Sequence, residues 1–351
     1  MLRRYRRLIT LMPIAALCLL YGASGWSWFP AEPDFQALNN PVESCIGCWP
    51  TATASAATVL PPQVRSGALT TRIPAQVKVH LVHRNLTLSV SFDEYCVGVL
   101  RAESSVEDRL EALKAQAIVS RTFALKNLGR HMREGFDFCS ITHCQRYAPK
   151  TSDSPRERLY EQAVAETAGQ VLLDDQGGLV DAYFNACCGG ATADIESIWS
   201  IKAPPYLRGV PDPYCRAMPN ANWTLVLPAD KLARALRSDP RTDVGPVVRR
   251  VVVESRDNAG RATAVSIEGN RTVSVRAWDF KIIVGRSLGW SVLKSSWFDV
   301  ARTLNGFVFH GHGFGHGVGL CQEGAHVMAK QGASCAQILA HYFPTTRIST
   351  E

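Results

Sequence analysis

The sequence changes character near residue 73, and this change limits where a folded core can form. Residues 26–72 hold six prolines and the low-complexity stretch 51–58, a composition that cannot bury an apolar core. From Ile73 onward, apolar residues recur with the periods of strands and helices. The whole chain is 46% hydrophobic and 20% charged, which excludes a largely disordered, collagen-like or coiled-coil protein. We therefore predict a tether over 26–72 and one folded region over 73–348.

The first 25 residues are typical of an export signal. Four arginines lie within the first seven residues and precede the short apolar run 8–21, which small residues follow. The run is shorter than the roughly 20 apolar residues of a spanning helix, so 1–25 is predicted to be a signal peptide, or a signal anchor if it is not cleaved. Without these four arginines, the net charge of +7 falls to 34 − 31 = +3. So small an excess does not favour a nucleic-acid partner.

The chain has eleven cysteines, which is many for a protein that stays in the cytosol. Export permits disulfides, and removal of Cys18 with the signal leaves ten, an even number that permits full pairing. Cys45 and Cys48 form a CxxC inside the tether. A local or intermolecular disulfide is the simplest interpretation there, because a redox site needs a folded context.

The folded region is predicted to be an α+β domain. Two alternating stretches, 76–82 and 86–92, predict a β-hairpin, and a long buried helix over 105–131 follows. Mostly antiparallel sheets are expected to pack on this helix, with 222–300 as a β-rich inserted subdomain. The shorter elements expected are helices at 156–167, 227–237, 325–331 and 335–341, and strands at 170–173, 179–184, 247–255, 262–268 and 271–275.

Glu103 is the first candidate catalytic residue. It follows the apolar stretch 95–102, interpreted as a strand, and precedes the long helix, whose start has the capping-box spacing of Ser104 and Glu107. Burial raises the pKa of a carboxyl group and suits a general acid, whereas a nearby helix N-terminus favours the carboxylate. A second cap for the helix is the structural alternative.

Three polar residues interrupt the apolar long helix: Gln116, Ser120 and Arg121. Buried polar groups need hydrogen-bond partners. These residues therefore either form a structural network or orient Glu103 or a substrate.

A short segment rich in cysteine and histidine is a candidate metal site. Cys139, His143 and Cys144 lie within six residues, and His131 is a further nitrogen donor. Such side chains bind zinc, and a disulfide of Cys139 with Cys144 or with a distant cysteine is the structural alternative. The adjacent pair Cys187-Cys188 is a weaker metal candidate, and either cysteine could pair with Cys215.

Glycines alternate with histidines over 309–320, in the order His310, His312 and His316. Glycine permits unusual dihedral angles and close approach of the backbone to a ligand. The histidines could bind metal, transfer protons or bond to sugar hydroxyls. The stretch lacks the strand–GxGxxG–helix order of a nucleotide site, and a tight turn with one structural histidine is the simpler alternative.

Together these segments resemble the SpoIID/LytB family of bacterial cell-wall proteins. Four stretches in the order of the family carry the resemblance, and they span about 73–348: 94–125, 139–147, 189–213 and 313–344. The chain departs from the family at Cys321, where Ser or Thr is usual, at Phe314, where Trp is usual, and at Cys187-Cys188, where small polar residues are common.

The resemblance implies an exported lytic transglycosylase. Such an enzyme cleaves MurNAc–GlcNAc bonds of peptidoglycan glycan strands, especially strands from which an N-acetylmuramoyl-L-alanine amidase has removed the stem peptides. The family's catalytic glutamate matches Glu103, which protonates the glycosidic oxygen and then takes a proton from the C6 hydroxyl of MurNAc, leaving a 1,6-anhydro end. The substrate-binding residues implied are Gln116, Arg121, Gln145, Tyr147, Gly189, Gly190, His316 and Gln322.

The resemblance also implies a zinc ion, because some members of the family carry one near the active site. The ligands match His131, Cys139 and Cys144, with His143 as the substitute for His131. The expected location is the bacterial cell envelope, outside the cytoplasm, with a membrane contact through the N-terminal segment if it is not cleaved.

Two other functions compete with the lytic transglycosylase. The first is a non-catalytic glycan-binding enhancer of a cell-wall amidase, against which the presence of Glu103 argues. The second is a metallopeptidase, which is weaker because the sequence has no HExxH motif.

Overall fold

The computed structural model describes residues 73–104 and 109–350, which lie within one compact unit, Ser66–Glu351. The predicted signal 1–25, the tether 26–72 with its CxxC, and Glu107 of the predicted capping box lie outside the described residues. No helix in the described ranges has the length and apolar character needed to cross a membrane.

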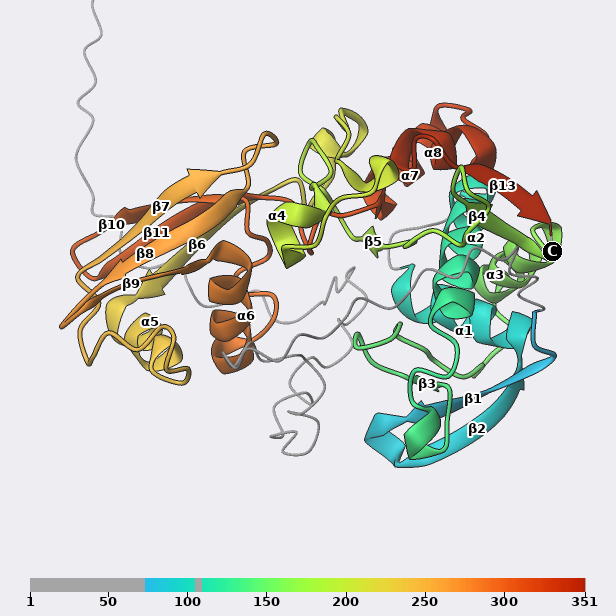
Figure 1. Ribbon diagram of the computed structural model, residues 1–351, viewed down its shortest axis with the longest axis horizontal. Helices are drawn as coiled ribbons and strands as arrows, with labels where there is room; N and C mark the ends of the chain where they lie inside the picture. The colour runs from blue at the N-terminus through green and yellow to red at the C-terminus, as the bar shows by residue number, and fades with distance from the viewer. Residues whose placement is uncertain (1–72, 105–108, 351) are drawn as a thin grey trace, which may run out of the picture. The chain divides into compact units, whose positions relative to one another are not determined.

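The described chain has the predicted α+β architecture, and its first elements form the expected hairpin (Figure 1). Strands β1 (Gln76–Leu81) and β2 (Leu86–Ser91) pair antiparallel, and Asn85 turns the chain with a left-handed φ of 47°. Strand β3 (Phe138–Cys139) adds to β1 in parallel. The hairpin is therefore extended by the segment that carries the candidate metal ligands.

Residues 92–103 form helix α1 (Phe92–Glu103) and not the apolar strand that we expected. Ser91 caps the helix, because its Oγ accepts a hydrogen bond of 3.1 Å from the Glu94 N–H. The apolar residues of α1 recur with helical spacing: Phe92, Tyr95, Cys96, Val99 and Leu100 are all buried. The alternating pattern of β2 therefore stops at Ser91, and the period of 3.6 begins there.

The predicted long helix is shorter than expected at both ends. Helix α2 (Leu110–Lys126) begins after Arg109, which makes no side-chain capping bond, so the capping-box spacing at 104–107 does not mark its start. It ends before His131, which instead precedes a short 3₁₀ turn, Met132–Glu134. The prediction that this helix is buried is confirmed, since every residue from Ala115 to Leu125 is buried.

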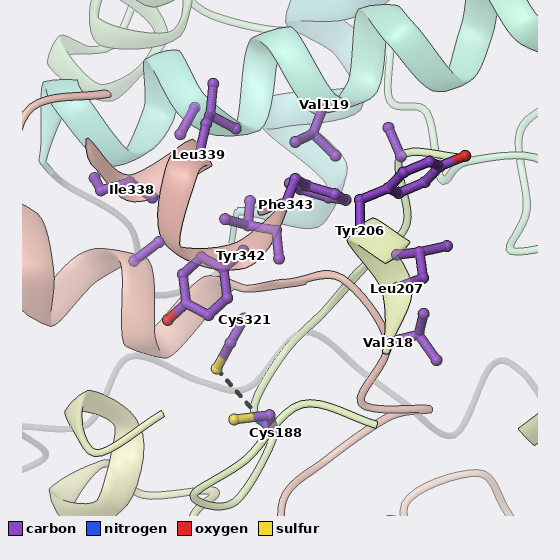
Figure 2. Packing of buried hydrophobic residues seen from close by; sticks show 14 of the residues in the cluster. Val119, Cys188, Tyr206, Leu207, Val318, Cys321, Ile338, Leu339, Tyr342 and Phe343 are labelled. Carbon is purple, nitrogen blue, oxygen red and sulfur yellow. Dashed lines mark hydrogen bonds between the residues drawn. The ribbon is translucent and has the colours of Figure 1, made fainter. Parts of the chain in front are cut away.

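Helix α2 lies between two apolar cores. One face, with residues such as Ile118 and Val119, belongs to a core that includes Leu339 and Phe343 from the C-terminal helices (Figure 2). The other face, with Leu113 and other residues, belongs to the core beneath α1 and the hairpin. This double contact explains why α2 has no exposed stripe.

The remaining elements of these two cores come from distant parts of the chain. Helix α3 (Pro155–Glu166) packs on α1 and α2, and strand β4 (Gln170–Leu173) pairs with β13 (Arg347–Thr350). The other members are β5 (Phe184–Asn185), α4 (Ile195–Trp199), β12 (Leu320–Cys321), α7 (Gln322–Lys330) and α8 (Cys335–Tyr342). Strands β5 and β12 pair in parallel, so the C-terminal helices are fastened to the middle of the chain.

The region from residue 222 has its own core and two antiparallel sheets. One sheet has the order β10 (Phe298–Arg302), β11 (Gly306–His312), β6 (Asn222–Pro228), and the other is β7 (Arg250–Arg256), β8 (Ala262–Glu268), β9 (Thr272–Arg276). The helices of this region are α5 (Ala229–Leu236) and α6 (Ala277–Leu288); sequence reasoning missed α6.

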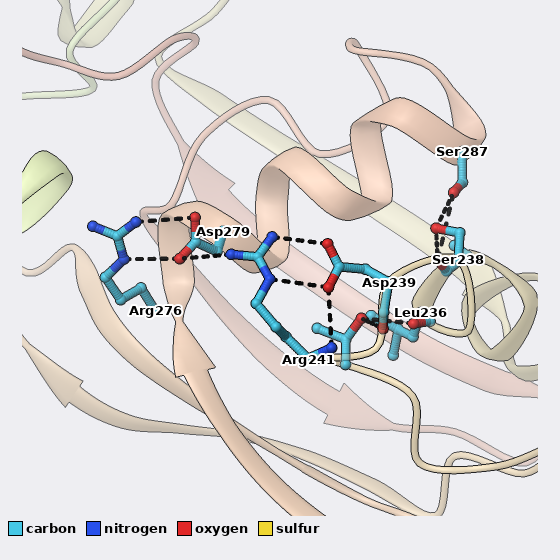
Figure 3. A network of polar contacts seen from close by, with 9 residues as sticks. Leu236, Ser238, Asp239, Arg241, Arg276, Asp279 and Ser287 are labelled. Atoms are coloured by element: carbon cyan, nitrogen blue, oxygen red, sulfur yellow. Dashed lines mark hydrogen bonds and ion pairs between the residues drawn. The ribbon is translucent and has the colours of Figure 1, made fainter. Parts of the chain in front are cut away.

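Three surface ion pairs form a network at the start of α6 and in the loop that follows α5, and the pair Arg241–Asp279 joins the two (Figure 3). Arg276 bonds to Asp279 at 2.8 Å, and Arg241 bonds to Asp239 at 2.8 Å and lies 3.7 Å from Asp279. The arginine side chains are half exposed, so these pairs orient the loop more than they stabilise it.

The burial of α2 gives a direct prediction about stability. Leu113→Ala removes a fully buried side chain and should lower the free energy of unfolding by about 2–5 kcal/mol. Leu128→Ala, whose side chain is 41% exposed just after α2, should change it by about 0.5 kcal/mol or less. Urea unfolding of both variants compares them, and equal losses would contradict the burial described.

Candidate functional site

Glu103 is the last residue of α1, and its carboxyl group is held from the facing loop. Oε1 of Glu103 accepts a hydrogen bond of 2.8 Å from the main-chain N–H of Arg146. The main-chain carbonyl of Glu103, which the end of α1 leaves without a helical partner, accepts a bond of 3.2 Å from Nε2 of Gln322. Three segments far apart in sequence therefore meet at this residue.

The surroundings of Glu103 favour its protonated form. Burial raises the pKa of Glu103, while the Arg146 N–H and the Arg146 charge oppose that rise, and burial has the larger effect. The C-terminal end of α1 also disfavours a negative charge, since the helix macrodipole is negative there. We expected the N-terminus of the long helix to act on Glu103. In the structure, Glu103 instead lies at the C-terminus of α1.

Gln322 connects Glu103 to the polar residues of α2. Its Nε2 lies 3.5 Å from Oε1 of Gln116, and Nε2 of Gln116 donates to Oγ of Ser120 at 3.0 Å. Gln116 and Ser120 are buried inside the helix packing. The structure thus brings Gln116 and Gln322 together with Glu103, through a chain of hydrogen bonds between side-chain amides.

The loop on the other side of Glu103 carries two more of the predicted residues. Gln145 is buried, its Oε1 accepts a bond of 3.2 Å from the Tyr95 hydroxyl, and its Nε2 has no partner among the described residues. Tyr147 stacks on Tyr95 with ring centroids 5.8 Å apart. Gly98 of α1 makes this contact possible, because a Cβ there would lie 2.1 Å from the Tyr147 ring.

Arg121 has a structural environment. Its side chain is fully buried and donates to the main-chain oxygens of Val164 at 3.2 Å and Gln170 at 3.1 Å. These bonds fasten α2 to the end of α3 and the start of β4. They engage Nη1 and Nη2 of the guanidinium group without a substrate, and they place it outside the set of residues that contact Glu103.

His131, Cys139, His143 and Cys144 converge, with their ligand atoms all within 4.8 Å of one another. Nε2 of His131 lies 3.1 Å from Nδ1 of His143, and the two Sγ atoms lie 3.7 Å and 3.8 Å from the same Nδ1. Both cysteines are free. Sequence reasoning treated the two histidines as alternatives, whereas the structure gathers both.

The donor set fits zinc. Zn–N bonds of about 2.0–2.1 Å and Zn–S bonds of about 2.3 Å give a tetrahedron with N–N edges near 3.3 Å and N–S edges near 3.6 Å. The Cys144 thiol, as hydrogen-bond donor, lowers the pKa of Cys139 to about 4, so Cys139 carries the thiolate that metals prefer. Glu134 lies 3.0 Å from Nδ1 of His131 and orients that ring, as an outer carboxylate does at zinc sites. Sequence reasoning missed Glu134, although its position three residues after His131 was a usable signal.

Gly189 and Gly190 lie where the chain crosses the glycine-rich motif. Both have positive φ, 84° and 125°, and a Cβ on Gly189 would lie 2.7 Å from the N of Gly313. Cys187 exchanges main-chain hydrogen bonds with Phe314 at the same crossing. Gly189 is therefore required by the close approach of two backbones, and Gly190 by its positive φ.

His316 lies among aromatic rings, with Trp199, Tyr183 and Trp278 at centroid distances of 5.1, 6.2 and 6.4 Å. Burial and the charges of Arg261 and Lys281 lower the pKa of His316 to about 3, so the ring stays neutral. Its Nδ1 accepts the Val318 N–H at 3.0 Å. The ring also forms a hydrogen bond with the main chain of Phe184, so it contributes an aromatic surface and is not a proton donor of the imidazolium type.

His310 and His312 face a different place from His316. They line a hollow of about 360 Å³ on β6 and β11, together with Asn222, Trp223 and Thr224. Nδ1 of His312 lies 2.8 Å from Oδ1 of Asn222, and Nδ1 of His310 lies 3.1 Å from Oγ1 of Thr224. Within the described ranges, the three motif histidines do not form a metal-ligating group.

A second group able to ligate a metal was only partly anticipated: Cys188 was a weaker metal candidate and Cys215 a pairing partner, while Asp212 and Cys321 were missed. Cys188, Asp212, Cys215 and Cys321 are all buried, and their ligand atoms lie within 4.8 Å of one another. The available signal was the excess of cysteines at 187, 188, 215 and 321 beyond those of the first group.

Comparison with known proteins identifies two regions of this chain. Residues 83–173 match the SpoIID family, "Stage II sporulation protein", and so include Glu103, Gln145 and the first metal-ligating group. Residues 222–319 match a domain of unknown function, DUF8618, which corresponds to the β-rich region.

Similar curated proteins cover more of the chain. An uncharacterized protein of Brachyspira hyodysenteriae is 31% identical over 72% of this chain, which spans 65% of that protein's length. Stage II sporulation protein D of Bacillus amyloliquefaciens is 28% identical over 79% of each chain. A protein of Bacillus subtilis named "Amidase enhancer" is 24% identical over 72% of this chain and 40% of its own length. The resemblance to the SpoIID/LytB family is thereby confirmed.

The raised pKa of Glu103 predicts a pH-dependent effect on stability. The folded state binds more protons than the unfolded chain between the unfolded pKa and the raised folded pKa, so stability falls as pH rises through that window. Glu103→Gln removes this cost. The variant should therefore be more stable than the wild type at about pH 8, and the difference should vanish below about pH 4.

Thermal unfolding across a pH series measures this difference. Glu254→Gln, at an exposed position on β7, is the matched control and should follow the wild type. A Glu103→Gln variant that is equally destabilised at every pH would contradict a raised pKa.

Proposed function

Because residues 83–173 form a SpoIID domain, we propose that this protein is a lytic transglycosylase that cleaves the glycan strands of bacterial peptidoglycan. The similar proteins support a role at the bacterial cell wall. The proposed glycan cleavage rests on the Glu103 carboxyl group, which is half-buried at the end of α1 and held by the Arg146 N–H.

Glu103 performs both proton transfers of the proposed reaction. As a neutral acid it donates its proton to the glycosidic oxygen between MurNAc and GlcNAc, and the bond from C1 to that oxygen breaks. The resulting carboxylate takes the proton of the MurNAc C6 hydroxyl while O6 bonds to C1, which closes the 1,6-anhydro ring and restores the acid. A carboxyl group with a raised pKa suits this cycle, since it must be protonated at the start.

The intramolecular attack explains why one carboxyl group is enough. Hydrolytic glycosidases use a second carboxylate to activate water or to attack the sugar. Among the described residues, the groups that shift the pKa of Glu103 are its buried surroundings and Arg146, with no second carboxylate.

The neighbours of Glu103 hold it in position for substrate. Arg146 N–H occupies Oε1, which leaves Oε2 to face the glycosidic oxygen. Gln145 in the same loop is buried, and its Oε1 accepts a hydrogen bond from the Tyr95 hydroxyl, so it fixes the loop that carries the Arg146 N–H. Gln322 and Gln116 fix the end of α1 from behind, and His316 among its aromatic neighbours offers an aromatic surface for the glycan.

We also propose that His131, Cys139, His143 and Cys144 hold one zinc ion. The ion would contribute structure, because it joins the turn after α2 to the loop 139–147, which carries the Arg146 N–H that contacts Glu103. The Glu134 carboxylate supports this assignment through its contact with His131.

The natural substrate is proposed to be glycan freed of stem peptides, with a cell-wall amidase as partner and the cell envelope as location. The alternative of a non-catalytic amidase enhancer rests on the name of the Bacillus subtilis relative. The two proposals differ in whether the protein breaks a glycosidic bond, which a product analysis decides.

Incubation of the full chain with amidase-treated glycan strands should yield 1,6-anhydro-MurNAc ends, detected by mass spectrometry. Glu103→Gln should reduce product formation by about 10²-fold or more, because the amide cannot donate the acidic proton. Glu254→Gln, an exposed control, should retain wild-type activity.

Each other outcome has a definite meaning. Reducing ends in place of anhydro ends would mean hydrolysis, and no cleavage by the wild type, with stimulation of an added amidase, would establish the enhancer. Equal activity of the wild type and Glu103→Gln would remove Glu103 from the catalytic role.

The zinc proposal has its own test, which does not depend on activity. Cys139→Ser should lose zinc from the first group, measured by elemental analysis of the purified full chain, because one of two thiolate ligands is missing. Glu134→Gln should keep the ion but release it faster to a chelator, by about 10-fold or more. A wild type in which Cys139 and Cys144 form a disulfide would overturn the proposal.

A further inference from the structure

A second group of thiols lies at the junction of three distant segments. Cys188 follows β5, Cys215 lies in the 3₁₀ turn Tyr214–Ala217, and Cys321 caps the N-terminus of α7. Sγ of Cys188 lies 3.5 Å from Sγ of Cys215 and 3.1 Å from Oδ2 of Asp212. All four side chains are fully buried, and no part of the proposed glycan chemistry uses them.

We infer that Cys188, Cys215, Cys321 and Asp212 form a second zinc site, with three thiolate ligands and one carboxylate ligand. Zn–S bonds of about 2.3 Å correspond to S–S edges of about 3.8 Å in a tetrahedron, and Zn–O bonds of about 2.0–2.2 Å to slightly shorter S–O edges. The observed separations of 3.5 Å and 3.1 Å lie close to these edges, and all four ligand atoms fall within 4.8 Å.

The sulfur atom of Cys321 is positioned as an acceptor for main-chain N–H groups. Sγ of Cys321 accepts main-chain N–H groups from Cys188 at 3.2 Å (Figure 2) and from Gly324 at 3.3 Å. The second of these lies in the first turn of α7, where the helix dipole attracts negative charge. A thiolate is the better acceptor of such bonds and the species that binds metal.

The carboxylate of Asp212 is held in place by hydrogen bonds from neighbouring residues. The Tyr342 hydroxyl donates to Oδ2 at 2.9 Å, and the main-chain N–H of Tyr214 donates to Oδ1 at 3.0 Å. Gly324 makes room for this contact, because a Cβ there would lie 2.1 Å from the Tyr342 oxygen and 2.4 Å from Oδ2 of Asp212. The carboxylate is thus fixed beside the thiols by groups from α7, α8 and the turn.

A buried cation lies beside the group and balances its charge. The Arg261 side chain is fully buried and donates to the main-chain oxygen of Cys188, while its Nε and Nη1 have no hydrogen-bond partner. A Zn²⁺ ion with three thiolates and one carboxylate carries a net charge of 2 − 4 = −2, which stabilises a guanidinium group in so dry a place. Neutral thiols would leave carboxylates such as Asp257 as the compensation for Arg261.

A disulfide is the main competing use of these cysteines. Cys188 and Cys215 are close enough to be joined by a small movement, but the bond would leave Cys321 and Asp212 buried without a role. Zinc uses all four groups, and each thiol that binds releases its proton to solvent. The ion would fasten α7 to the segments after β5, and so would hold Gln322, the residue after Cys321, against Glu103.

The test separates this site from the first one and from activity. In a Cys139→Ser/Cys144→Ser variant of the full chain, purified without chelators, elemental analysis should find about one zinc ion per chain. Adding Cys321→Ser should remove it, whereas adding Cys335→Ser, a buried cysteine outside both groups, should leave it in place.

If the variant with Cys139→Ser, Cys144→Ser and Cys321→Ser does not fold, the Cys139→Ser/Cys144→Ser variant provides a second test. X-ray absorption at the zinc edge should fit three sulfur atoms and one oxygen atom, and cobalt substitution should give the bands of a tetrahedral thiolate site. A zinc-free variant, a mass lower by about 2 Da from a Cys188–Cys215 disulfide, or zinc that survives Cys321→Ser would overturn the inference.

Discussion

The structure depends on the complete burial of α2 between two apolar cores. A helix without an exposed stripe must satisfy every polar side chain inside the protein, because no water reaches it. Arg121 does so for its two terminal nitrogens, through carbonyls at the end of α3 and the start of β4, and Gln116 does so through Ser120 and Gln322. The same packing that stabilises the domain thus determines which polar groups stand behind Glu103.

Glu103 owes its properties to where α1 ends. The residue completes a buried helix, so its carbonyl needs a donor, which Gln322 supplies, and its carboxyl group lies in a place that disfavours charge. The Arg146 N–H limits this effect and orients one oxygen. A partly buried acid with one fixed oxygen is the arrangement that general acid catalysis at a glycosidic bond requires.

Both cysteine-rich groups serve to connect segments that the chain itself keeps apart. The first joins the turn after α2 to the loop beside Glu103, and the second joins the segments after β5 and before β6 to the start of α7. If both hold zinc, one ion supports the loop that carries the Arg146 N–H and the other supports the start of α7, which carries Gln322. Rigid support of this kind suits a site in which one carboxyl group must serve as both acid and base.

Local pattern was enough for the elements whose partners lie nearby in sequence. The hairpin of β1 and β2, helix α3, and the three strands β7, β8 and β9 follow from alternation, periodicity and turn residues, and the α+β class follows from them. The motifs around Glu103 and His316 indicated the family for the same reason. The stretch 92–103 was misassigned because its continuous apolar run is compatible with a strand, and the capping contact of Ser91 with Glu94 decided for the helix.

What only the tertiary structure decided is where distant groups meet. Spacing could not bring Cys188, Cys215 and Cys321 together, because the chain separates them by up to 133 residues. Nor could it place Gln322 against Glu103, or set Arg121 apart from them. The sequence by itself determined the residue types and the local elements, since these depend on neighbours along the chain. The ligand sets and the environment of Glu103 depend on how α2 is enclosed, which is a property of the folded core.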